Sequence, residues 1–505
     1  MIRDLLRRGT RTRDLPVHDC DILVIGSGAG GGTAALELAA AGRHVTILEE
    51  GPRVGTAELA AATPAENMRR LYRQGGLTPI FGRPTIAYGE GRCVGGTTVV
   101  NGGLFWEPPP DLLDDWATTS GIDGYRSQDL APHLQRITRR LGVITQQHGD
   151  GNRDSELLAA GADKLGWSWQ HARRAVRGCA HRNRCTTGCV SGAKQSMALS
   201  YLPEAEALGA EIVPGTRALR IQHDGRDVRG VLTVDSHGRR SLYRPRALFV
   251  AAGPLGTPTL LQRSRIHPDR AGREIALHVN LRTVARFDED VRAREGTIFT
   301  AQVQEFTHGG VLMMPSNVTP GGLAAAVASH GPGTVERLLE QIDRLGVFTT
   351  QVRPAGHARL STTPLGGTLL RHGMTAADHA GLRTAFRDSA RLLFAAGAVE
   401  LVPPVATAGP LRDLLDVEEF CARVTPADWE LVSVHGMASC RMGLADRGGV
   451  CDGFGRPHGF RNVRLCDASV LPGGTGISPQ GTIMAFAQEI ATRFLEGAGK
   501  DSTAH

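Results

Sequence analysis

The sequence predicts an α/β fold with a Rossmann-like domain near its N-terminus and at least one further domain. Three observations support this prediction. A chain of 505 residues is long enough to form two cores, and its length suggests two or three domains. An apolar content of 41% together with 64 glycines fits a loop-rich α/β protein rather than a disordered chain. The third observation is a strand–turn–helix–strand pattern that begins at Asp21.

This pattern has the spacing of a dinucleotide-binding unit. Short apolar runs predict a strand over 21–25, an alanine-rich helix over 33–41 and a second strand over 44–48. The glycines in G-x-G-x-x-G register after the first strand are Gly26, Gly28 and Gly31. Such glycines allow a tight turn and let the backbone approach a pyrophosphate at the helix N-terminus. Glu49 ends the second strand, and we expect it to accept hydrogen bonds from an adenosine ribose.

Charge and cysteine usage exclude several classes of protein. The 57 basic and 51 acidic residues give a formal charge of +6 without a long block of one sign, so no nucleic-acid partner is expected. No apolar run has the length of a membrane span, and the first twenty residues lack the apolar core of a signal peptide. Nine cysteines at uneven spacing favour a reducing compartment over a disulfide framework. We therefore expect a cytoplasmic protein.

Residues 88–106 form a second glycine-rich segment. They read YGEGRCVGGTTVVNGGLFW, with six glycines in nineteen positions, which is too irregular for a helix or an alternating strand. A loop of this kind brings backbone N–H groups and small side chains against a large flat ligand. The residues of this loop that we expect to contact the ligand are Gly95, Gly96, Thr97 and Asn101.

The stretch 431–495 carries a candidate catalytic histidine. His435 lies at the edge of an apolar run, and a histidine, with an ordinary pKa of about 6.5, can take a hydroxyl proton near neutral pH. A short strand that ends at Asp467 and a helix that begins near Pro479 follow it. An acid at a strand end and a helix N-terminus facing the same space suit a ligand with hydroxyls and delocalised negative charge.

Four of these stretches, in this order, resemble the glucose–methanol–choline (GMC) family of FAD oxidoreductases. They are HVTILEEG at 44–51, the loop at 88–106, AAGPLGTPTLL at 251–261 and the region around His435. The resemblance implies a GMC, p-hydroxybenzoate-hydroxylase-like fold, in which a Rossmann-like FAD-binding domain joins an antiparallel-sheet substrate domain with helices behind the sheet. Several family members attach the flavin covalently through a histidine in the loop. Val99 and Val100 occupy that place here, so the resemblance implies non-covalent FAD.

The resemblance also implies how the chain is divided. The FAD-binding domain is expected to be discontinuous, comprising 15–115, 190–275 and 431–500. The substrate domain would then comprise 116–189 and 276–430. Within it, the segment Thr375 to Ala396 predicts an amphipathic helix that begins with a Thr375-x-x-Asp378 capping box.

Two active-site groups follow from the family pattern. His435 falls on the position of the family's catalytic histidine, which takes the hydroxyl proton while hydride leaves the same carbon for the flavin. The second group is commonly an asparagine in N-P-x-x-T, where this chain has Ser478 followed by Pro479. Serine has a shorter reach than asparagine. The substrate would lie closer, a water would fill the gap, or Gln480 or Asn101 would replace it. Asp467 resembles the family residue near the flavin ribityl and pyrophosphate groups.

A cysteine-rich segment, 177–194, allows three interpretations. Cys179, Cys185 and Cys189 have the spacing C-x5-C-x3-C. Three thiolates suffice for a [3Fe–4S] cluster, and His181 would complete a Cys3His zinc set. The third interpretation is a loop without metal. The segment resembles cysteine-rich segments in the FAD subunits of bacterial glucose and fructose dehydrogenases, which bind a [3Fe–4S] cluster.

The resemblance implies an FAD-dependent dehydrogenase or oxidase that converts a CH–OH group, for example a primary alcohol of a sugar or aminosugar, to the carbonyl. The 6′-alcohol dehydrogenases of aminoglycoside biosynthesis are one specific possibility. The alternatives are a subunit that passes electrons through a [3Fe–4S] cluster, a flavin-binding protein without turnover and a zinc-stabilised NAD enzyme. The electron acceptor, whether oxygen, a quinone or a carrier protein, is left open by the sequence.

Overall fold

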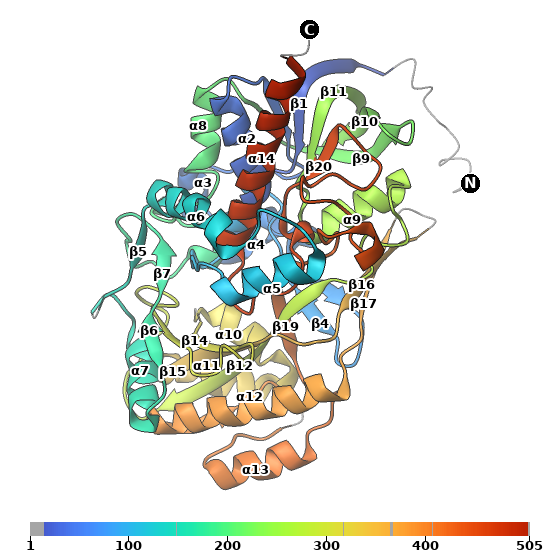
Figure 1. Ribbon diagram of the computed structural model, residues 1–505. Coiled ribbons are helices and arrows are strands. Elements are labelled where there is room, and N and C mark those ends of the chain that lie inside the picture. Colours follow the sequence, from blue (N-terminus) through green and yellow to red (C-terminus); the bar gives the residue numbers. More distant parts are fainter. Residues whose placement is uncertain (1–14, 148, 317, 364–366, 407, 503–505) are drawn as a thin grey trace, which may run out of the picture.

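The computed structural model describes residues 15–147, 149–316, 318–363, 367–406 and 408–502. Two large sheets organise these residues (Figure 1). The first, which includes the N-terminal strand, lies in the upper half of the view beside the C-terminal helix, and the second lies in the lower half above a long helix.

The first sheet has the strand order β8-β2-β1-β11-β10-β9, with β20 paired to β11. The strands β8, β2, β1, β11 and β20 run parallel, and β10 and β9 continue the sheet antiparallel. Their bounds are β1 Val17–Ile25, β2 Val45–Leu48, β8 Glu211–Val213, β9 Thr216–His223, β10 Val228–Asp235, β11 Arg240–Val250 and β20 Val463–Leu465. The central strands of this sheet are apolar and buried.

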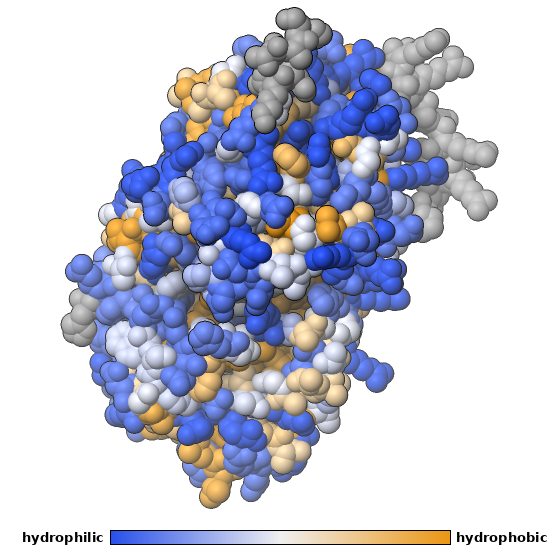
Figure 2. Space-filling model, in the orientation of Figure 1, coloured by the Kyte–Doolittle hydropathy of each residue, from blue (hydrophilic) through white to orange (hydrophobic). Residues whose placement is uncertain are grey.

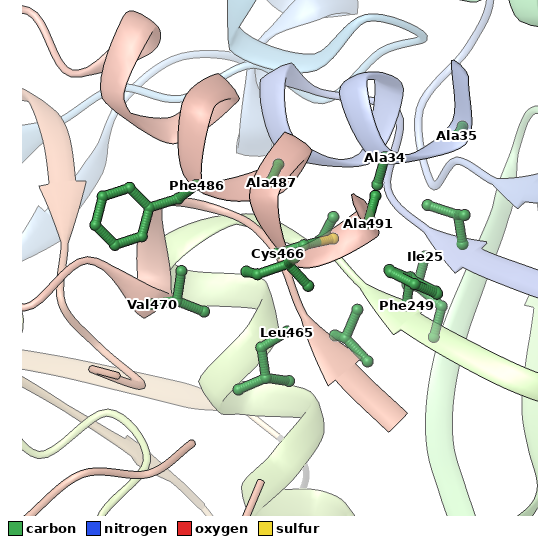
Figure 3. Packing of buried hydrophobic residues seen from close by; sticks show 14 of the residues in the cluster. Ile25, Ala34, Ala35, Phe249, Leu465, Cys466, Val470, Phe486, Ala487 and Ala491 are labelled. Atoms are coloured by element: carbon green, nitrogen blue, oxygen red, sulfur yellow. The ribbon is translucent and has the colours of Figure 1, made fainter. Parts of the chain in front are cut away.

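Helices α2 (Ala29–Ala40) and α14 (Gln480–Ser502) pack against each other on this sheet. Small side chains let them approach closely: Ala34, Ala35, Ala487 and Ala491 lie over Ile25 and Phe249 (Figure 3). The strand–helix–strand unit predicted from the glycine motif is therefore confirmed. Helices α6 (Ser127–Leu141) and α8 (Tyr201–Ala207) flank the same layer, and α9 (Gly253–Ser264) contacts β9.

The second sheet has the order β3-β4-β19-β12-β15-β14-β13-β6, with β18 paired to β12. It is antiparallel except for the parallel pair β19 and β4. Its bounds are β3 Thr78–Ile80, β4 Ile86–Tyr88, β6 Trp169–His171, β12 Ala276–Phe287, β13 Ala301–Val303, β14 Val311–Pro315, β15 Leu345–Val352, β18 Ala398–Val402 and β19 Leu431–Met437.

One face of the second sheet is packed against helices. Helix α12 (Ala376–Ala395) contacts β15 and β18, and α7 (Arg153–Leu165) contacts β13 and β14. The predicted capping box at the start of α12 is confirmed, since Thr375 Oγ1 accepts a hydrogen bond from the N–H of Asp378 at 3.1 Å. The predicted antiparallel sheet with helices behind it is likewise observed, with α13 (Leu414–Arg423) outside α12 (Figure 1).

Shorter elements complete the described chain. The helices are α3 Thr56–Ala61, α4 Pro64–Leu71, α5 Pro110–Ser120, α10 Pro320–Ala326 and α11 Pro332–Glu340. The remaining strands form two small antiparallel pairs, β5 Val143–Thr145 with β7 Arg173–Ala175 and β16 Ala358–Thr362 with β17 Thr368–His372.

Three segments lie in a different half of the molecule from the one predicted. Strands β3 and β4, expected in the FAD-binding domain, belong to the second sheet, as does β19. Helix α6, expected in the substrate domain, packs against α14 in the first core. Apolar periodicity gives the type of an element but not the sheet or helix it joins.

The face of the molecule in Figure 2 is mainly hydrophilic, with small separate hydrophobic areas, one of them at the lower end where α13 lies. No helix among the described residues is long and apolar enough to cross a membrane.

Replacing Phe486 by alanine tests the packing of α14. The ring is 1% exposed and lies with its centroid 4.6 Å from that of Tyr125 and 6.4 Å from that of Trp116. We expect Phe486→Ala to lower the free energy of unfolding by about 3–5 kcal/mol, because it leaves a cavity. Denaturant unfolding followed by circular dichroism measures this. Leu415→Ala, at a side chain that is 75% exposed, should change it by less than about 0.5 kcal/mol. Equal effects of the two substitutions would contradict the packing.

Candidate active site

Backbone packing explains two of the three motif glycines. A Cβ on Gly26, whose φ is +99°, would lie 2.2 Å from the Ala251 carbonyl oxygen, and one on Gly31 would lie 1.9 Å from the Gly26 oxygen. Gly30, which the motif spacing did not single out, is equally constrained, because its Cβ would lie 1.9 Å from the Cys466 oxygen. Around Gly28, in contrast, the closest atom to such a Cβ is 3.8 Å away.

A cavity of about 700 Å³ opens beside this turn. Its lining includes six residues predicted to bind the cofactor: Gly26, Gly28, Glu49, Gly96, Thr97 and Asp467. Gly31, Gly95, Asn101 and Pro479 do not line it. The N-terminus of α2 has no acidic residue in its first turn, and four arginines line the cavity: Arg73, Arg92, Arg217 and Arg263. A helix N-terminus and guanidinium groups favour the phosphates of a dinucleotide.

Glu49 is held at the edge of the cavity by three hydrogen bonds. Its Oε2 accepts from the Ser27 N–H at 3.1 Å and from the Ser27 hydroxyl at 2.7 Å, and its Oε1 accepts from the Gly51 N–H at 2.8 Å. Burial raises the pKa of this carboxyl, against the effect of these donors. The carboxylate is therefore oriented where a ribose hydroxyl could bind it.

The glycine-rich loop is fixed by a lysine that the sequence analysis missed. The Lys194 Nζ donates to the carbonyl oxygens of Val99, Asn101 and Cys185 at 2.7–2.8 Å. Burial lowers the pKa of Lys194 to about 8. The sequence analysis could not detect this contact, because Lys194 lies 93 residues from Asn101 in the chain.

Asp467 connects the end of β20 to helix α9. Its Oδ2 accepts from the Gly253 N–H at 2.8 Å and from the Thr257 hydroxyl at 2.6 Å, and its Oδ1 accepts from the Ser469 N–H at 2.8 Å. Burial raises the pKa of this carboxyl. Asp467 is thus a fixed acceptor at the wall of the cavity.

His435 pairs with a second histidine from the neighbouring strand. Strands β12 and β19 place His278 directly opposite His435. The two Nδ1 atoms lie 3.0 Å apart, and the rings are nearly perpendicular, at 81°. His278 is fully buried, whereas His435 is partly exposed. Pro254, which lines the cavity, lies against Gly436, the residue after His435.

The loop before α14 is hydrogen-bonded to strands β12 and β15 of the second sheet. The Gly476 N–H donates to His278 Nε2 at 3.0 Å, and Gln351 Nε2 donates to the Gly476 oxygen at 2.9 Å. Arg353 Nη1 lies 3.4 Å from the oxygen of Gly474. Sequence reasoning missed His278 and Gln351, since neither stands in a motif of the C-terminal region.

Ser478, the predicted second active-site residue, lies in the loop before α14, whereas His435 lies on strand β19. Ser478 is partly exposed in the loop that Gly476 anchors. The Asn101 amide donates to Gln480 Oε1 at 2.6 Å, and its Oδ1 accepts from the Gly103 N–H at 3.0 Å. Asn101 and Gln480 therefore hold the glycine-rich loop to the start of α14, directly after Pro479.

Comparison with known proteins gives the family. Models described as GMC oxidoreductase match residues 68–280 and 354–487, and an FAD binding domain matches residues 21–65. The chain belongs to the GMC oxidoreductase family. GMC oxidoreductases are FAD-dependent enzymes that act on CH–OH donors, and the glycine turn, Glu49 and the cavity fit FAD.

Several relatives span most of this GMC oxidoreductase. A GMC-type oxidoreductase of Mycobacterium tuberculosis is 34% identical over 94% of this chain and 76% of its own length. A long-chain-alcohol oxidase of Arabidopsis thaliana is 29% identical over 94% of this chain and 67% of its own length. Paromamine 6'-oxidase of Streptomyces fradiae is 28% identical over 99% and 95%. The crystal structure of pyridoxine 4-oxidase from Mesorbium loti superimposes with a TM-score of 0.73 at 18% identity, covering 94% of this chain and 99% of that one.

The cysteine segment does not form the metal-ligand set that the sequence suggested. Cys179 Sγ lies 3.5 Å from Thr297 Oγ1, Cys185 Sγ accepts from Arg174 at 3.4 Å, and Cys189 Sγ accepts from the Lys194 N–H at 3.4 Å. Within the described parts of the chain, no three His, Cys, Asp or Glu side chains are grouped to hold a metal ion. This arrangement fits neither the [3Fe–4S] cluster nor the zinc site with His181.

Metal analysis tests the interpretation of this segment as a loop without metal. We expect the purified GMC oxidoreductase to show a flavin spectrum without stoichiometric iron or zinc, because its thiols bind different partners. Elemental analysis and the visible spectrum measure this, with the triple substitution of Cys179, Cys185 and Cys189 to serine as the control. A brown protein with about three iron atoms per chain, lost in the triple variant, would show that these cysteines bind a [3Fe–4S] cluster.

Glu49→Gln tests the cofactor cradle. The amide would turn an N–H group toward donors that Glu49 now accepts from, so we expect FAD affinity to fall about ten- to a hundredfold. Fluorescence titration of the stripped protein with FAD measures the change. Glu58→Gln, on exposed α3, is the matched control and should leave the affinity unchanged. An unaltered affinity in Glu49→Gln would exclude this carboxylate from the cofactor site.

Proposed function

We propose that this enzyme oxidises the CH–OH group of a polar primary alcohol to the carbonyl with non-covalent FAD, and that His435 contacts the hydroxyl oxygen. The observation that carries the proposal is the His435–His278 pair on strands β19 and β12, one residue from Gly436, which packs on the cavity wall. When bound, FAD would accept the hydride from the alcohol carbon. Val99 and Val100 are buried and cannot bond covalently to flavin, which supports non-covalent binding.

The chain's own residues would orient the cofactor. Glu49 and the turn at Gly28 are positioned for the ribose and the pyrophosphate. The N-terminus of α14 has no acidic residue in its first turn, so its dipole would favour negative charge on the ring system. Lys194 and Asn101 keep the glycine-rich loop closed.

A sugar or aminosugar alcohol is the substrate class that we propose first. Paromamine 6'-oxidase is a relative over nearly the whole of both chains. The face of the second sheet that carries His278 also presents Asn280 and Gln351, which stand opposite each other in the register. Polar groups at such positions favour a substrate with several hydroxyl or amino groups.

A long-chain alcohol is the second candidate, because the Arabidopsis relative is named for that substrate class. The electron acceptor, whether oxygen, a quinone or a carrier protein, and a cytoplasmic location stay proposals of the same kind. Anaerobic mixing with a panel of aminoglycosides, sugars and long-chain alcohols tests the substrate class by bleaching of the flavin absorbance. A protein without turnover would keep its oxidised spectrum with every alcohol.

His435→Ala tests the catalytic assignment. We expect the variant to keep bound FAD but to lose about a hundred- to ten-thousandfold in the rate of flavin reduction, because no group then contacts the hydroxyl oxygen. Stopped-flow absorbance with the best alcohol of the panel measures this rate. His237→Ala, at an exposed turn between β10 and β11, should reduce at the wild-type rate. An unchanged rate in His435→Ala would remove this histidine from the reaction.

A further inference from the structure

The contact between His278 and His435 can hold one hydrogen atom. Their Nδ1 atoms are 3.0 Å apart, so one ring donates its N–H and the other accepts with its lone pair. Two N–H groups facing each other would repel. The direction of this hydrogen bond determines which nitrogen of His435 carries the remaining hydrogen.

The backbone at Gly476 fixes that direction. A peptide N–H can only donate, and the Gly476 N–H points at His278 Nε2 at 3.0 Å. His278 Nε2 must therefore accept. Burial lowers the pKa of His278 well below its ordinary value, with further contributions from His435 and Arg353, so the ring is neutral. Its single hydrogen is on Nδ1, and His278 donates to His435.

We propose that His278 is a positioning residue that holds His435 as the neutral tautomer with hydrogen on Nε2, so that His435 meets the substrate oxygen as a hydrogen-bond donor. The tautomer follows from the contacts within the chain, whereas the encounter with a substrate oxygen rests on the proposed function. In this state neither ring nitrogen of His435 has a free lone pair: Nδ1 accepts from His278, and Nε2 carries the hydrogen.

The role of His435 then differs from the general base that the family pattern implies. The hydroxyl proton would pass to solvent water, while the electron pair of the C–H bond leaves with the hydride and the O–H pair closes the carbonyl. The His435 N–H would stabilise the negative charge that develops on the oxygen, as preorganised donors do in other enzymes.

The groups around the pair oppose protonation of His435. Although His435 is partly exposed, the surrounding protein removes most of the solvent from its ring, and this desolvation lowers its pKa to about 4. His278 presents an N–H on one side, and Arg353 adds positive charge near His278. From β4, Tyr88 lies against Gly436, and burial raises its pKa well above the ordinary value, so it is neutral. No carboxylate of the described chain is hydrogen-bonded to the His435 ring. An imidazolium at position 435 would thus be destabilised.

Nitrogen-15 NMR of the FAD-loaded protein, labelled at histidine, reads the tautomer directly. The His435 signals are identified by their loss in His435→Asn. In the wild-type protein we expect the hydrogen on Nε2, a non-protonated Nδ1 and no titration above about pH 5. In His278→Leu we expect a mixture of the two neutral tautomers, because no group then fixes which ring nitrogen carries the hydrogen. The pKa of His435 should stay low in this variant, since burial, which lowers it, is unchanged.

Two further variants separate positioning from structural support. Gln351→Leu removes the other side-chain contact to Gly476 but leaves the histidine pair, so its His435 spectrum should match the wild type. His278→Gln can accept from Gly476 through its oxygen and donate to His435 through its amide, so it should restore the Nε2 tautomer. If His278→Leu does not fold, the spectrum of His278→Gln decides.

Hydrogen on His435 Nδ1 in the wild type, or an unchanged Nε2 tautomer in a folded His278→Leu, would overturn the proposal. So would a mixture of tautomers in His278→Gln. Failure of every alcohol to reduce the flavin would remove the proposed function but leave the NMR result standing.

Discussion

The hydrogen bond from the Gly476 N–H to His278 Nε2 joins the two halves of the active site. His278 belongs to the second sheet, while Gly476 belongs to the loop that leads into α14 and so into the first core. Gln351 donates to the carbonyl oxygen of the same residue, which belongs to the next peptide group. Since a buried peptide group must keep its partners, a movement of the sheet relative to α14 would cost two hydrogen bonds. The position of His435 relative to the cofactor cavity depends on this junction.

On the cofactor side, the position of α2 depends on close contacts between backbone segments. Gly26, Gly30 and Gly31 allow α2 to lie against β11 and the end of β20, so the helix N-terminus opens into the cavity. Glu49 and Asp467 are buried acids whose oxygens are engaged by N–H and hydroxyl donors. Each keeps a fixed orientation because its donors belong to different segments. Contacts within the chain therefore hold this part of the cavity wall in place.

The sequence predicted the features that depend on neighbours in the chain. The glycine turn, Glu49, the loop at 88–106 and the capping box of α12 are local patterns with a known conformation, and the structure has each of them. His278 could not be predicted, because it meets His435 across 157 residues and carries no motif. Lys194 was missed for the same reason. The cysteine spacing left three interpretations open, because spacing alone does not show that three thiols near in sequence contact three separate partners.

The departure of this chain at Ser478 is consistent with the histidine pair. Family members commonly place an asparagine at that position, beside the catalytic histidine. Here the loop has a serine, and the ring nitrogen of His435 is engaged from the sheet by His278 instead. His278 is a buried imidazole with one N–H and one ring lone pair, and both are engaged: the lone pair by the Gly476 N–H and the N–H by His435. The orientation of His435 can therefore be set without an amide at position 478.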